Sequence, residues 1–248
     1  MFTGKTINMG VIGNPISHSL SPAMQNAGIQ AAGLDYAYIA MPVRNENLGE
    51  AVAGLKALGF RGFNVTIPHK QAIMEYLDEI HEDAKIIGAV NAVKNDNGHL
   101  IGYNTDVTGF IDGMKQQGFS PAGRNAVLLG AGGAARAIIW GLIKEQVKSL
   151  TIGVRNVAKV QPVADHFSRY LHIEVLDWSR VQPDTFVYDI IYTPAETLFL
   201  RTAREQGCRT LNGEAMLVGQ GAEAFRLWTG KELPQEPMAA ALRAALKG

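Results

Sequence analysis

The fold of this chain is decided by the sequence AVLLGAGGAA at residues 126–135. Its first four residues form an apolar strand that we expect to be buried on both faces of a sheet. The next six fit the pattern G-x-G-x-x-A and lead into an apolar helix over residues 134–144. Glycines at such a turn let the backbone approach a pyrophosphate, and the helix amides that follow face its phosphates. The stretch therefore predicts a dinucleotide-binding loop, with contacts from Gly130, Ala131, Gly132, Gly133 and Ala134.

The rest of the chain alternates strand-like and helix-like stretches, the pattern of an α/β protein whose mainly parallel sheet is covered by helices. A break rich in Gly, Ser and Pro at residues 118–124 precedes the glycine-rich unit. We therefore expect two domains, an N-terminal, mainly parallel α/β/α domain and a Rossmann-like dinucleotide-binding domain. Within the first, Asn97-Gly98 predicts a type I′ hairpin turn.

Composition excludes several other classes of protein. The 248 residues are 47% hydrophobic and 19% charged, which is typical of a globular chain and not of a disordered one. Lys plus Arg and Asp plus Glu both total 23, so no net positive field favours nucleic acid. No apolar run approaches the roughly 18 residues of a membrane-spanning helix, and the N-terminus does not resemble a signal peptide. We expect a cytoplasmic protein without membrane or nucleic-acid partners; whether it is a monomer or a homodimer stays open.

The one cysteine, Cys208, cannot form a disulfide within the chain, which fits a reducing compartment. It lies between a predicted helix and a predicted strand, with no histidine nearby in sequence. We expect a structural role for it, and we expect no metal site.

The type of dinucleotide is indicated at the end of the second strand of the glycine-rich unit. NAD sites usually carry an acidic residue about 20 positions after the glycines, where it binds the ribose 2′-hydroxyl. This chain has Val154-Arg155-Asn156 there, with Lys159 one helical turn further on. A guanidinium and an ammonium suit a 2′-phosphate by charge and by hydrogen-bond geometry. We therefore expect NADP as the cofactor; the alternative is that both cations are solvated surface residues.

Four further clusters lie at predicted strand ends or helix starts, where ligands bind in open α/β sheets. They are the stretches 17–22 (SHSLSP), 64–70 (NVTIPHK), 89–93 (AVNAV) and 104–106 (NTD). Taken one at a time, their residues have ordinary explanations. Ser21 has the features of an N-cap for a helix that begins at Pro22. Asn91 is typical of a turn, and Lys70 with Asp106 of a surface pair.

Together, these clusters resemble the shikimate dehydrogenase family. The family pattern H-S-x-S-P is met at residues 18–22, N-V-T-x-P-x-K at 64–70, V-N at 90–91 and N-T-D at 104–106, with the glycine loop in its expected place. The stretches YDIIYTP (188–194), NG (212–213), MLVGQ (216–220) and residues 225–230 extend the likeness over nearly the whole chain. The resemblance implies an oxidoreductase of chorismate and aromatic amino-acid biosynthesis that reduces 3-dehydroshikimate to shikimate with NADPH. It also implies that residues 1–107 with 237–248 form a substrate domain and residues 108–236 the Rossmann-like NADP-binding domain.

The resemblance also implies a role for each group of site residues. Lys70 and Asp106 would be the catalytic pair, because reduction of a ketone needs a proton as well as a hydride, and an ammonium can supply it. His69 would serve packing rather than catalysis. The implied contacts are Ser19, Ser21 and Tyr192 for the substrate carboxylate; Thr66, Asn91 and Gln220 for the ring hydroxyls; and, besides the glycine loop with Arg155 and Lys159, Ile190 and Gly213 for the cofactor.

Three features depart from the family pattern. Val107 stands where the family usually has Gly, and a β-branched residue there is expected to crowd the helix start. Val154 replaces the usual Asn before Arg155. Between Val175 and Leu176 about 25 residues are missing, including a strand and a loop that would lie beside the strand feeding the glycine loop. Either the sequence omits residues of the natural protein, or the chain is a truncated homologue with a damaged cofactor domain; the first is favoured because a lost core strand would expose a long apolar edge.

Two alternatives stand beside an NADP-dependent shikimate dehydrogenase. One is a quinate/shikimate dehydrogenase that uses NAD, against which Arg155 argues. The other is a catalytically impaired ligand-binding homologue, which the missing segment and Val107 motivate. For the enzyme we expect the active site in a cleft between the two domains, where closure would exclude water.

Overall fold

The computed structural model describes residues 3–130, 132–153, 157–167, 170–171, 173–174 and 184–246. The chain divides into two compact units, one of Met1–Thr105 with Val218–Gly248 and one of Asp106–Leu217. The boundaries expected from the sequence are at 107 and 237. The second boundary lies earlier in the structure because helix α8 (Glu214–Thr229) packs its buried aromatic residues on the first unit: Phe225 contacts Tyr36, and Trp228 contacts Tyr38.

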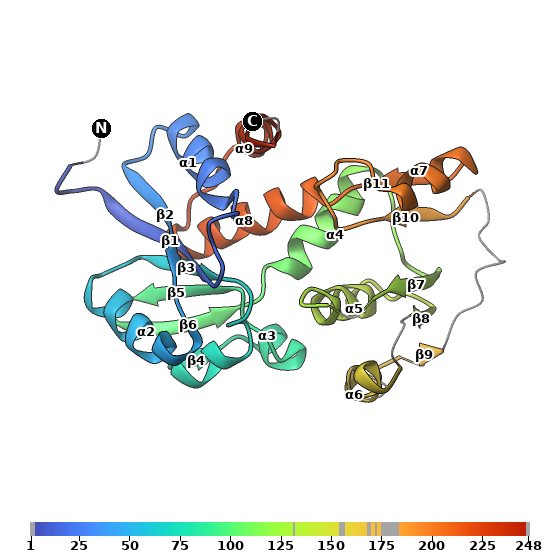
Figure 1. The fold of residues 1–248 in the computed structure, drawn as a ribbon, viewed down its shortest axis with the longest axis horizontal. Helices are drawn as coiled ribbons and strands as arrows, with labels where there is room; N and C mark the ends of the chain where they lie inside the picture. Colours follow the sequence, from blue (N-terminus) through green and yellow to red (C-terminus); the bar gives the residue numbers. More distant parts are fainter. Residues whose placement is uncertain are drawn as a thin grey trace. The chain divides into compact units, whose positions relative to one another are not determined.

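The first unit holds a six-stranded sheet in the order β2-β1-β3-β5-β6-β4 (Figure 1). The strands are β1 (Ile7–Gly13), β2 (Tyr36–Pro42), β3 (Gly62–Val65), β4 (Glu79–Ile80), β5 (Ala92–Asp96) and β6 (His99–Tyr103). β1 is parallel to β2 and β3, whereas β5 is antiparallel to β3 and β6. The predicted hairpin is confirmed, because Asn97 and Gly98 join β5 to β6 with positive φ angles of 53° and 92°. The two-residue β4, parallel to β6, was not predicted.

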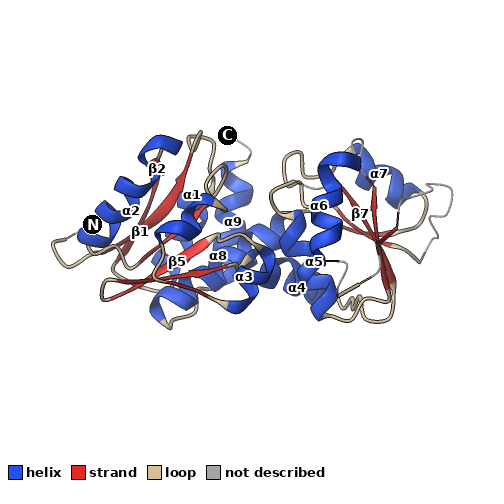
Figure 2. Ribbon diagram, turned by 90° about the horizontal axis from the view of Figure 1, so that it is seen from below, coloured by secondary structure: helices blue, strands red, loops and turns tan. Residues whose placement is uncertain are grey.

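Helices cover both faces of this sheet (Figure 2). They are α1 (Ser21–Ala31), α2 (Leu48–Ala57), α3 (Glu82–Ile87), α8 from Val218 onward and α9 (Gln235–Ala245), with the short 3-10 helices η1 (Asn45–Asn47) and η2 (Ala72–Tyr76). Side chains of β3 alternate between the faces. Phe63 and Val65 pack with α2 in one apolar cluster, whereas Gly62 faces Trp228 of α8. None of the described helices is long and apolar enough to cross a membrane.

Gly62 is required by the close packing of α8 on the sheet. A methyl group at this position would collide with the indole ring of Trp228, which is fully buried. We expect Gly62→Ala to lower the free energy of unfolding by about 1–3 kcal/mol through overpacking, measured by urea denaturation. The matched control is Gly54→Ala in α2, where no atom lies within 4 Å of the added methyl group; it should raise stability by up to about 1 kcal/mol. Equal effects of the two substitutions would contradict the packing argument.

The second unit carries the glycine loop between β7 (Asn125–Leu129) and α5 (Ala135–Lys144). β7 is parallel to β8 (Ser149–Gly153), which is parallel to β9 (Ile173–Glu174). A separate parallel pair consists of β10 (Phe186–Tyr188) and β11 (Arg209–Leu211). The remaining helices of this unit are α4 (Asp106–Gln116), α6 (Val157–Phe167), α7 (Leu198–Glu205) and the first residues of α8.

The packing of this unit bears on the expectations for Val107 and Cys208. α4 begins at Asp106, and Val107 is buried against α5 near Gly141, so the β-branched side chain does not disturb the helix start. Cys208 is buried in an apolar cluster, in keeping with the structural role expected of it. The other members of the cluster are Val187, Leu200 and Ala203.

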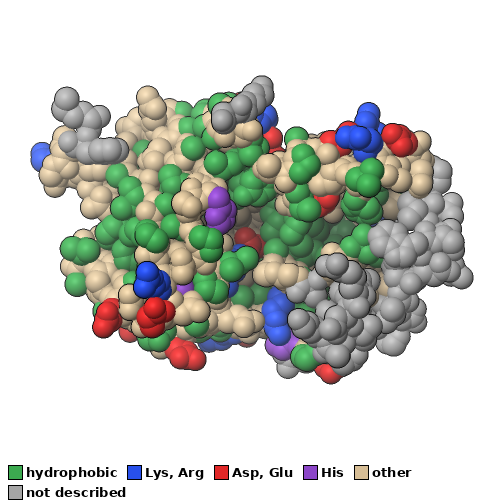
Figure 3. All heavy atoms as spheres, viewed as in Figure 1, with side chains coloured by type: hydrophobic (Ala, Val, Ile, Leu, Met, Phe, Trp, Pro, Cys, Tyr) green, Lys and Arg blue, Asp and Glu red, His purple; other side chains and the backbone are tan. Residues whose placement is uncertain are grey.

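Sequence analysis predicts that β7 is buried on both faces, and this prediction is wrong. The side chains of Val127 and Leu129 are 55% and 37% exposed. Among the described residues β7 pairs only with β8, and β10 only with β11. β7 is therefore an edge strand that presents unpaired backbone groups and apolar side chains to solvent. Apolar residues after β10, Ile190 and Ile191, are exposed as well, and Figure 3 shows apolar side chains on the surface of this part of the unit.

One side of β7 has no partner strand among the described residues. A doubly wound dinucleotide-binding sheet has the strand order 3-2-1-4-5-6. β9-β8-β7 follow the order 3-2-1, so strand 4 of this arrangement would lie on the unpartnered side of β7; we call this position the strand-4 vacancy. Eleven residues separate Glu174 from Phe186, whereas each parallel connection needs a crossover of about a dozen residues or more. The connection is therefore too short for a parallel fourth strand and its two crossovers. This agrees with the gap that the sequence predicts between Val175 and Leu176. That junction itself lies outside the described residues.

Candidate active site

The predicted substrate-binding residues of the first unit gather at one edge of its sheet. β1 and β3 are parallel, so the segments that follow them leave the sheet at the same edge. Those segments carry Ser19, Ser21, Thr66 and Lys70. β5 is antiparallel to β3, and Asn91 immediately precedes it, so Asn91 lies at that edge too. β6 ends there and leads into residues 104–106, so four clusters that are distant in sequence share one edge.

The loop that carries Thr66 and Lys70 is held by hydrogen bonds at both ends. The Thr66 amide donates to a carbonyl of β1 at 3.0 Å, and the Lys70 carbonyl accepts from the Val90 amide at 2.7 Å. Between them, His69 is 1% exposed, and its Nε2 lies 2.7 Å from the Val43 carbonyl oxygen. An imidazole N–H that donates to this carbonyl fixes the loop, in keeping with the packing role expected of His69. Lys70 is left half-buried at the end of the braced loop.

Asn91 is part of a buried hydrogen-bond network. Its Oδ1 accepts from the Thr105 amide at 2.7 Å, and its Nδ2 donates to Thr105 Oγ1 at 3.1 Å. The Asn64 side chain donates to the Asn91 carbonyl at 3.0 Å and accepts from the Tyr38 hydroxyl at 2.7 Å. Burial raises the pKa of Tyr38 well above its ordinary value, so the hydroxyl stays protonated and remains a donor. The network fixes the backbone at Thr105 and thereby the start of α4 at Asp106.

Ser19 and Ser21 stand at the start of α1, and the N-cap predicted at Ser21 is wrong. The helix starts at Ser21 itself, with Leu20 at the N-cap position. Ser19 Oγ accepts from the Ser21 amide at 3.3 Å, so Ser19 supplies the acceptor at this turn. Within the described part of the chain the Ser21 hydroxyl has no hydrogen-bond partner. It is therefore not consumed by a cap and is able to bond a ligand.

The glycine loop has the geometry of an anion-binding turn. Gly130 follows β7 with a φ of +89°, a conformation that a side chain would strain. No atom lies within 4 Å of a methyl group built on Gly132, so the loop is open there. α5 starts at Ala135, with Ala134 at the N-cap position and no side chain bonded to the cap. The first-turn amides and the helix dipole favour a phosphate at this point, so these residues fit a dinucleotide.

Two predicted cofactor contacts, Ile190 and Gly213, lie against each other in the second unit. A methyl group on Gly213 would collide with the Ile190 carbonyl, and the Gly213 amide donates to the Ile191 carbonyl at 3.0 Å. Only glycine permits this close approach of the segment after β11 to the segment after β10. Tyr192, the predicted carboxylate ligand, follows in the latter segment and is half-buried.

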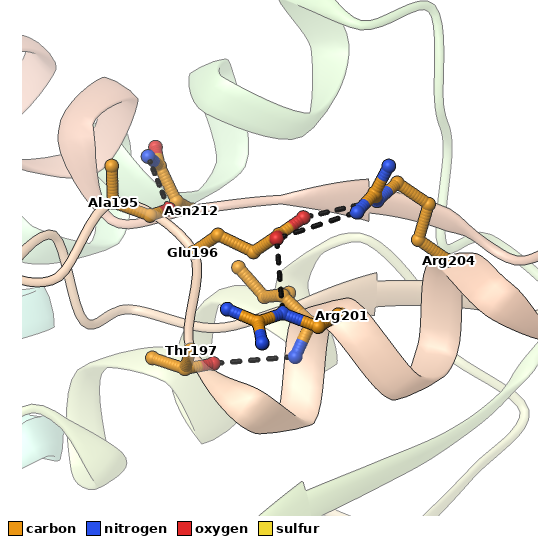
Figure 4. Close-up of polar contacts among 7 residues, drawn as sticks. Ala195, Glu196, Thr197, Arg201, Arg204 and Asn212 are labelled. Atoms are coloured by element: carbon orange, nitrogen blue, oxygen red, sulfur yellow. Dashed lines mark hydrogen bonds and ion pairs between the residues drawn. The ribbon is translucent and has the colours of Figure 1, made fainter.

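Polar contacts brace the segment that follows Tyr192 (Figure 4). Asn212 Nδ2 donates to a carbonyl of this segment at 3.0 Å. Thr197 Oγ1 accepts from a first-turn amide of α7 at 3.2 Å. The Glu196 carboxylate lies 3.0 Å from Arg204 of α7. These contacts tie the segment to α7 and to the end of β11, and so hold the chain beside Tyr192.

The predicted site residues divide between the two units. The first unit contains Ser19, Ser21, Thr66, Lys70, Asn91 and Gln220; the second contains Asp106, Tyr192, Ile190, Gly213 and the glycine loop. Ala131, Val154 and Arg155 lie outside the described residues, and of Lys159 only its place in α6 is described. Sequence analysis missed the supporting roles of Asn64 and Thr105, which stand inside quoted motifs, and of Tyr38, which no motif signals. No group of three or more His, Cys, Asp or Glu in the described ranges could hold a metal ion.

Comparisons with known proteins bear on this arrangement. The family profile described as "Shikimate dehydrogenase substrate binding domain" matches residues 11–93, and the one described as "Shikimate 5'-dehydrogenase C-terminal domain" matches residues 213–243. The shikimate dehydrogenase (NADP(+)) of Geobacter sulfurreducens is 42% identical, with 99% of each chain covered. The chain belongs to the shikimate dehydrogenase family.

Solved structures of shikimate dehydrogenases match the fold over nearly the whole chain. One, in complex with NADP+, has a TM-score of 0.93 at 37% identity and covers 99% of this chain and 98% of its own. The enzyme of Thermus thermophilus, in complex with NADP(H) and shikimate, has a TM-score of 0.87 at 32% identity, with 97% and 100% covered. The α/β fold with a substrate domain and a Rossmann-like domain is thus that of shikimate dehydrogenases.

The same comparisons bear on the strand-4 vacancy. The alignment with the Geobacter sulfurreducens shikimate dehydrogenase runs over 282 positions, whereas this chain has 248 residues. That relative therefore carries residues that this chain lacks. The shortfall is large enough for a strand together with its crossover connection.

Proposed function

We propose that this protein catalyses the reversible, NADPH-dependent reduction of 3-dehydroshikimate to shikimate, a step of chorismate and aromatic amino-acid biosynthesis. The observation that carries the proposal is the shared sheet edge, where loops held by hydrogen bonds carry Thr66 and Lys70, and where the buried Asn91 fixes the chain that leads to Asp106. Hydroxyl, amide and ammonium groups suit a polyhydroxylated ring that carries a ketone. The relatives that are named NADP(+)-dependent shikimate dehydrogenases support the same reaction.

The reduction needs a hydride at the carbonyl carbon and a proton at the carbonyl oxygen. NADPH supplies the hydride when it is bound. Lys70 donates the proton, since its ammonium stands at the end of a loop that hydrogen bonds hold in place. In the reverse direction the Lys70 amine accepts the proton of the substrate hydroxyl. We assign Asp106, which is buried at the start of α4, to orient the ammonium and to accept a hydrogen bond from the same hydroxyl.

The remaining polar residues select and orient the substrate. We assign Ser19, Ser21 and Tyr192 to its carboxylate, and the unused hydroxyl of Ser21 supports this role. We assign Thr66, Asn91 and Gln220 to bind the ring hydroxyls. A site built to hydrogen-bond hydroxyls rejects analogues that lack them by a factor of about 10⁴ or more. The protein should therefore discriminate strongly against deoxygenated analogues of shikimate.

Arg155 is expected to set the preference for NADP over NAD. The glycine loop and the start of α5 fit the pyrophosphate that both cofactors share, so the preference has to come from the end of the second strand. We expect Arg155→Ala to raise KM for NADP+ by about tenfold or more, because a charge-assisted bond to the 2′-phosphate is lost. KM for NAD+ should stay within about twofold. Steady-state kinetics with both cofactors measure this.

The control for net charge is Lys148→Ala, an exposed cation between α5 and β8 of the same unit. Its KM values for both cofactors should equal those of the parent chain. Equal losses with NADP+ and NAD+ in Arg155→Ala would contradict the role given to Arg155.

A catalytically impaired homologue is the second candidate, and the strand-4 vacancy favours it. The test is NADPH oxidation by the purified chain with 3-dehydroshikimate, together with calorimetric binding of shikimate. Turnover supports the enzyme. Binding without turnover would assign the chain to the second candidate, and neither binding nor turnover would overturn both. We propose the cytoplasm as its compartment, in keeping with a single cysteine that is buried and structural.

A further inference from the structure

We propose that Gln25 is a positioning residue of the substrate site, because its side chain ties α1 to α8 between two substrate ligands. α1 opens with Ser21, and α8 carries Gln220 next to Gly221, the partner of Gln25. The inference rests on the proposed function, in which Ser21 binds the substrate carboxylate and Gln220 a ring hydroxyl. The spacing of these two ligands has to match the length of one substrate molecule.

Gln25 joins helices that come from distant parts of the chain. It lies one turn after Ser21 and hence on the same face of α1. The side chain is fully buried, and its Nε2 donates to the Gly221 carbonyl at 2.8 Å. A carbonyl can only accept, which fixes the end of the amide that faces α8. The bond therefore fixes α8 against α1, and it does so at Gly221, the residue next to Gln220.

The backbone of α8 comes close to Gln25 because α8 has a glycine at the contact. A methyl group built on Gly221 would lie 3.0 Å from Gln25 Nε2 and 2.6 Å from the end of the Met24 side chain. No side chain of α8 intervenes between its backbone and the Gln25 amide. A shift of one helix against the other is thus passed directly to Ser21 on one side and Gln220 on the other.

The oxygen end of the Gln25 amide indicates that a contribution to the stability of the fold does not account for a glutamine at this position. Gln25 Oε1 is buried and has no hydrogen-bond partner within the described part of the chain. A buried acceptor without a donor destabilises a fold. Methionine has nearly the same length and would fill the space without that penalty. What methionine lacks is the N–H group that holds Gly221, and this is the group that positions α8.

The chain offers a matched control in Asn95. Its amide side chain is also buried, and its Oδ1 accepts from the Gly98 amide at 2.7 Å. Asn95 lies near the hairpin end of β5, at the edge of the sheet opposite Asn91. A substitution there also removes a hydrogen bond between an amide side chain and the backbone, here with the side chain as acceptor, but at the opposite edge of the sheet from Asn91.

The experiment compares Gln25→Met with Asn95→Leu, using kcat, KM for shikimate and for NADP+, calorimetric Kd for shikimate, and Tm. In Gln25→Met we expect KM and Kd for shikimate to rise about tenfold, because misplaced ligands lose binding geometry. kcat and KM for NADP+ should stay within about twofold. Tm should change little, because the substitution removes the hydrogen bond, which stabilises the fold, together with the unpartnered oxygen, which destabilises it. Asn95→Leu should lower Tm and leave every kinetic constant unchanged. Gln25→His, whose ring N–H can donate to the same carbonyl, should recover part of the loss.

Gly221→Ala tests the same contact from α8 and does not remove Gln25. The added methyl group displaces Gln25 Nε2, so KM for shikimate should rise here too. An unchanged shikimate KM and Kd in both Gln25→Met and Gly221→Ala, or a loss confined to Tm as in Asn95→Leu, would overturn the proposal. If the parent chain oxidises shikimate and these variants do so with the same KM and Kd for shikimate, only the role of Gln25 fails. If the parent chain neither binds nor oxidises shikimate, the proposed function fails and this inference fails with it.

Discussion

Lys70→Ala is expected to lower kcat/KM for 3-dehydroshikimate by about 10³-fold, because a general acid contributes about 10²–10⁴ to a proton transfer. The loss should fall mainly on kcat. The loop itself is held by backbone hydrogen bonds at Thr66 and at the carbonyl of residue 70, and these survive the substitution. KM for NADP+ should hardly change, since the glycine loop belongs to the other unit. NADPH oxidation at saturating cofactor, with the folded state checked by circular dichroism, measures the effect.

Lys56→Ala is the control for removal of a lysine from the same unit. Lys56 forms an exposed ion pair with Asp78 at 3.2 Å and has no part in the site. Such surface pairs contribute about 0–1 kcal/mol, so neither activity nor stability should change much. Lys70→Arg keeps the charge but holds its proton too tightly to release it, and should recover little of kcat. Retention of more than about a tenth of the parent activity in Lys70→Ala would refute the role of Lys70 as proton donor.

Filling the strand-4 vacancy is expected to be the other large effect. We would insert, at the predicted junction between Val175 and Leu176, the segment of the Geobacter sulfurreducens relative that has no counterpart in this chain. KM for NADP+ should fall by about tenfold or more, because a strand beside β7 would hold the glycine loop that β7 feeds. Tm should rise by several degrees, since burial of one large apolar side chain contributes about 1.5–3 kcal/mol and two are exposed on β7, Val127 and Leu129.

The control is an insertion of equal length made of Gly and Ser at the same junction. A flexible linker relaxes the short connection between β9 and β10 but supplies no apolar strand. It should therefore leave KM for NADP+ and Tm near the values of the parent chain. If the linker were as effective as the relative's segment, chain length rather than strand pairing would be the cause. If neither insertion changed cofactor binding, the vacancy would have no bearing on function.

The candidate site is predicted from sequence through the family resemblance, and local physics adds where its motifs lie on the sheet. The stretches 64–70 and 104–106 place polar side chains just after strands, and parallel strands bring their ends to one edge. The hairpin at Asn97-Gly98 and the turn at Gly130 are readable for a similar reason, because positive φ angles select Gly and Asn. The roles of Lys70, Thr66 and Asp106 stay predictions that rest on the family resemblance.

The tertiary structure alone decided four other matters. The helix cap of α1 is at Leu20 and not at Ser21, α8 belongs to the first unit from Val218 onward, β7 is exposed at an edge, and Gln25 contacts Gly221. Each of these depends on partners far away in the chain or on the acceptor that a neighbour happens to supply. Local pattern records which face of an element is apolar, but not which element covers that face. For this protein the sequence by itself determined the chemistry of the strand ends, whereas long-range packing decided which strands pair, and an apolar strand such as β7 is buried only when a neighbour is present to cover it.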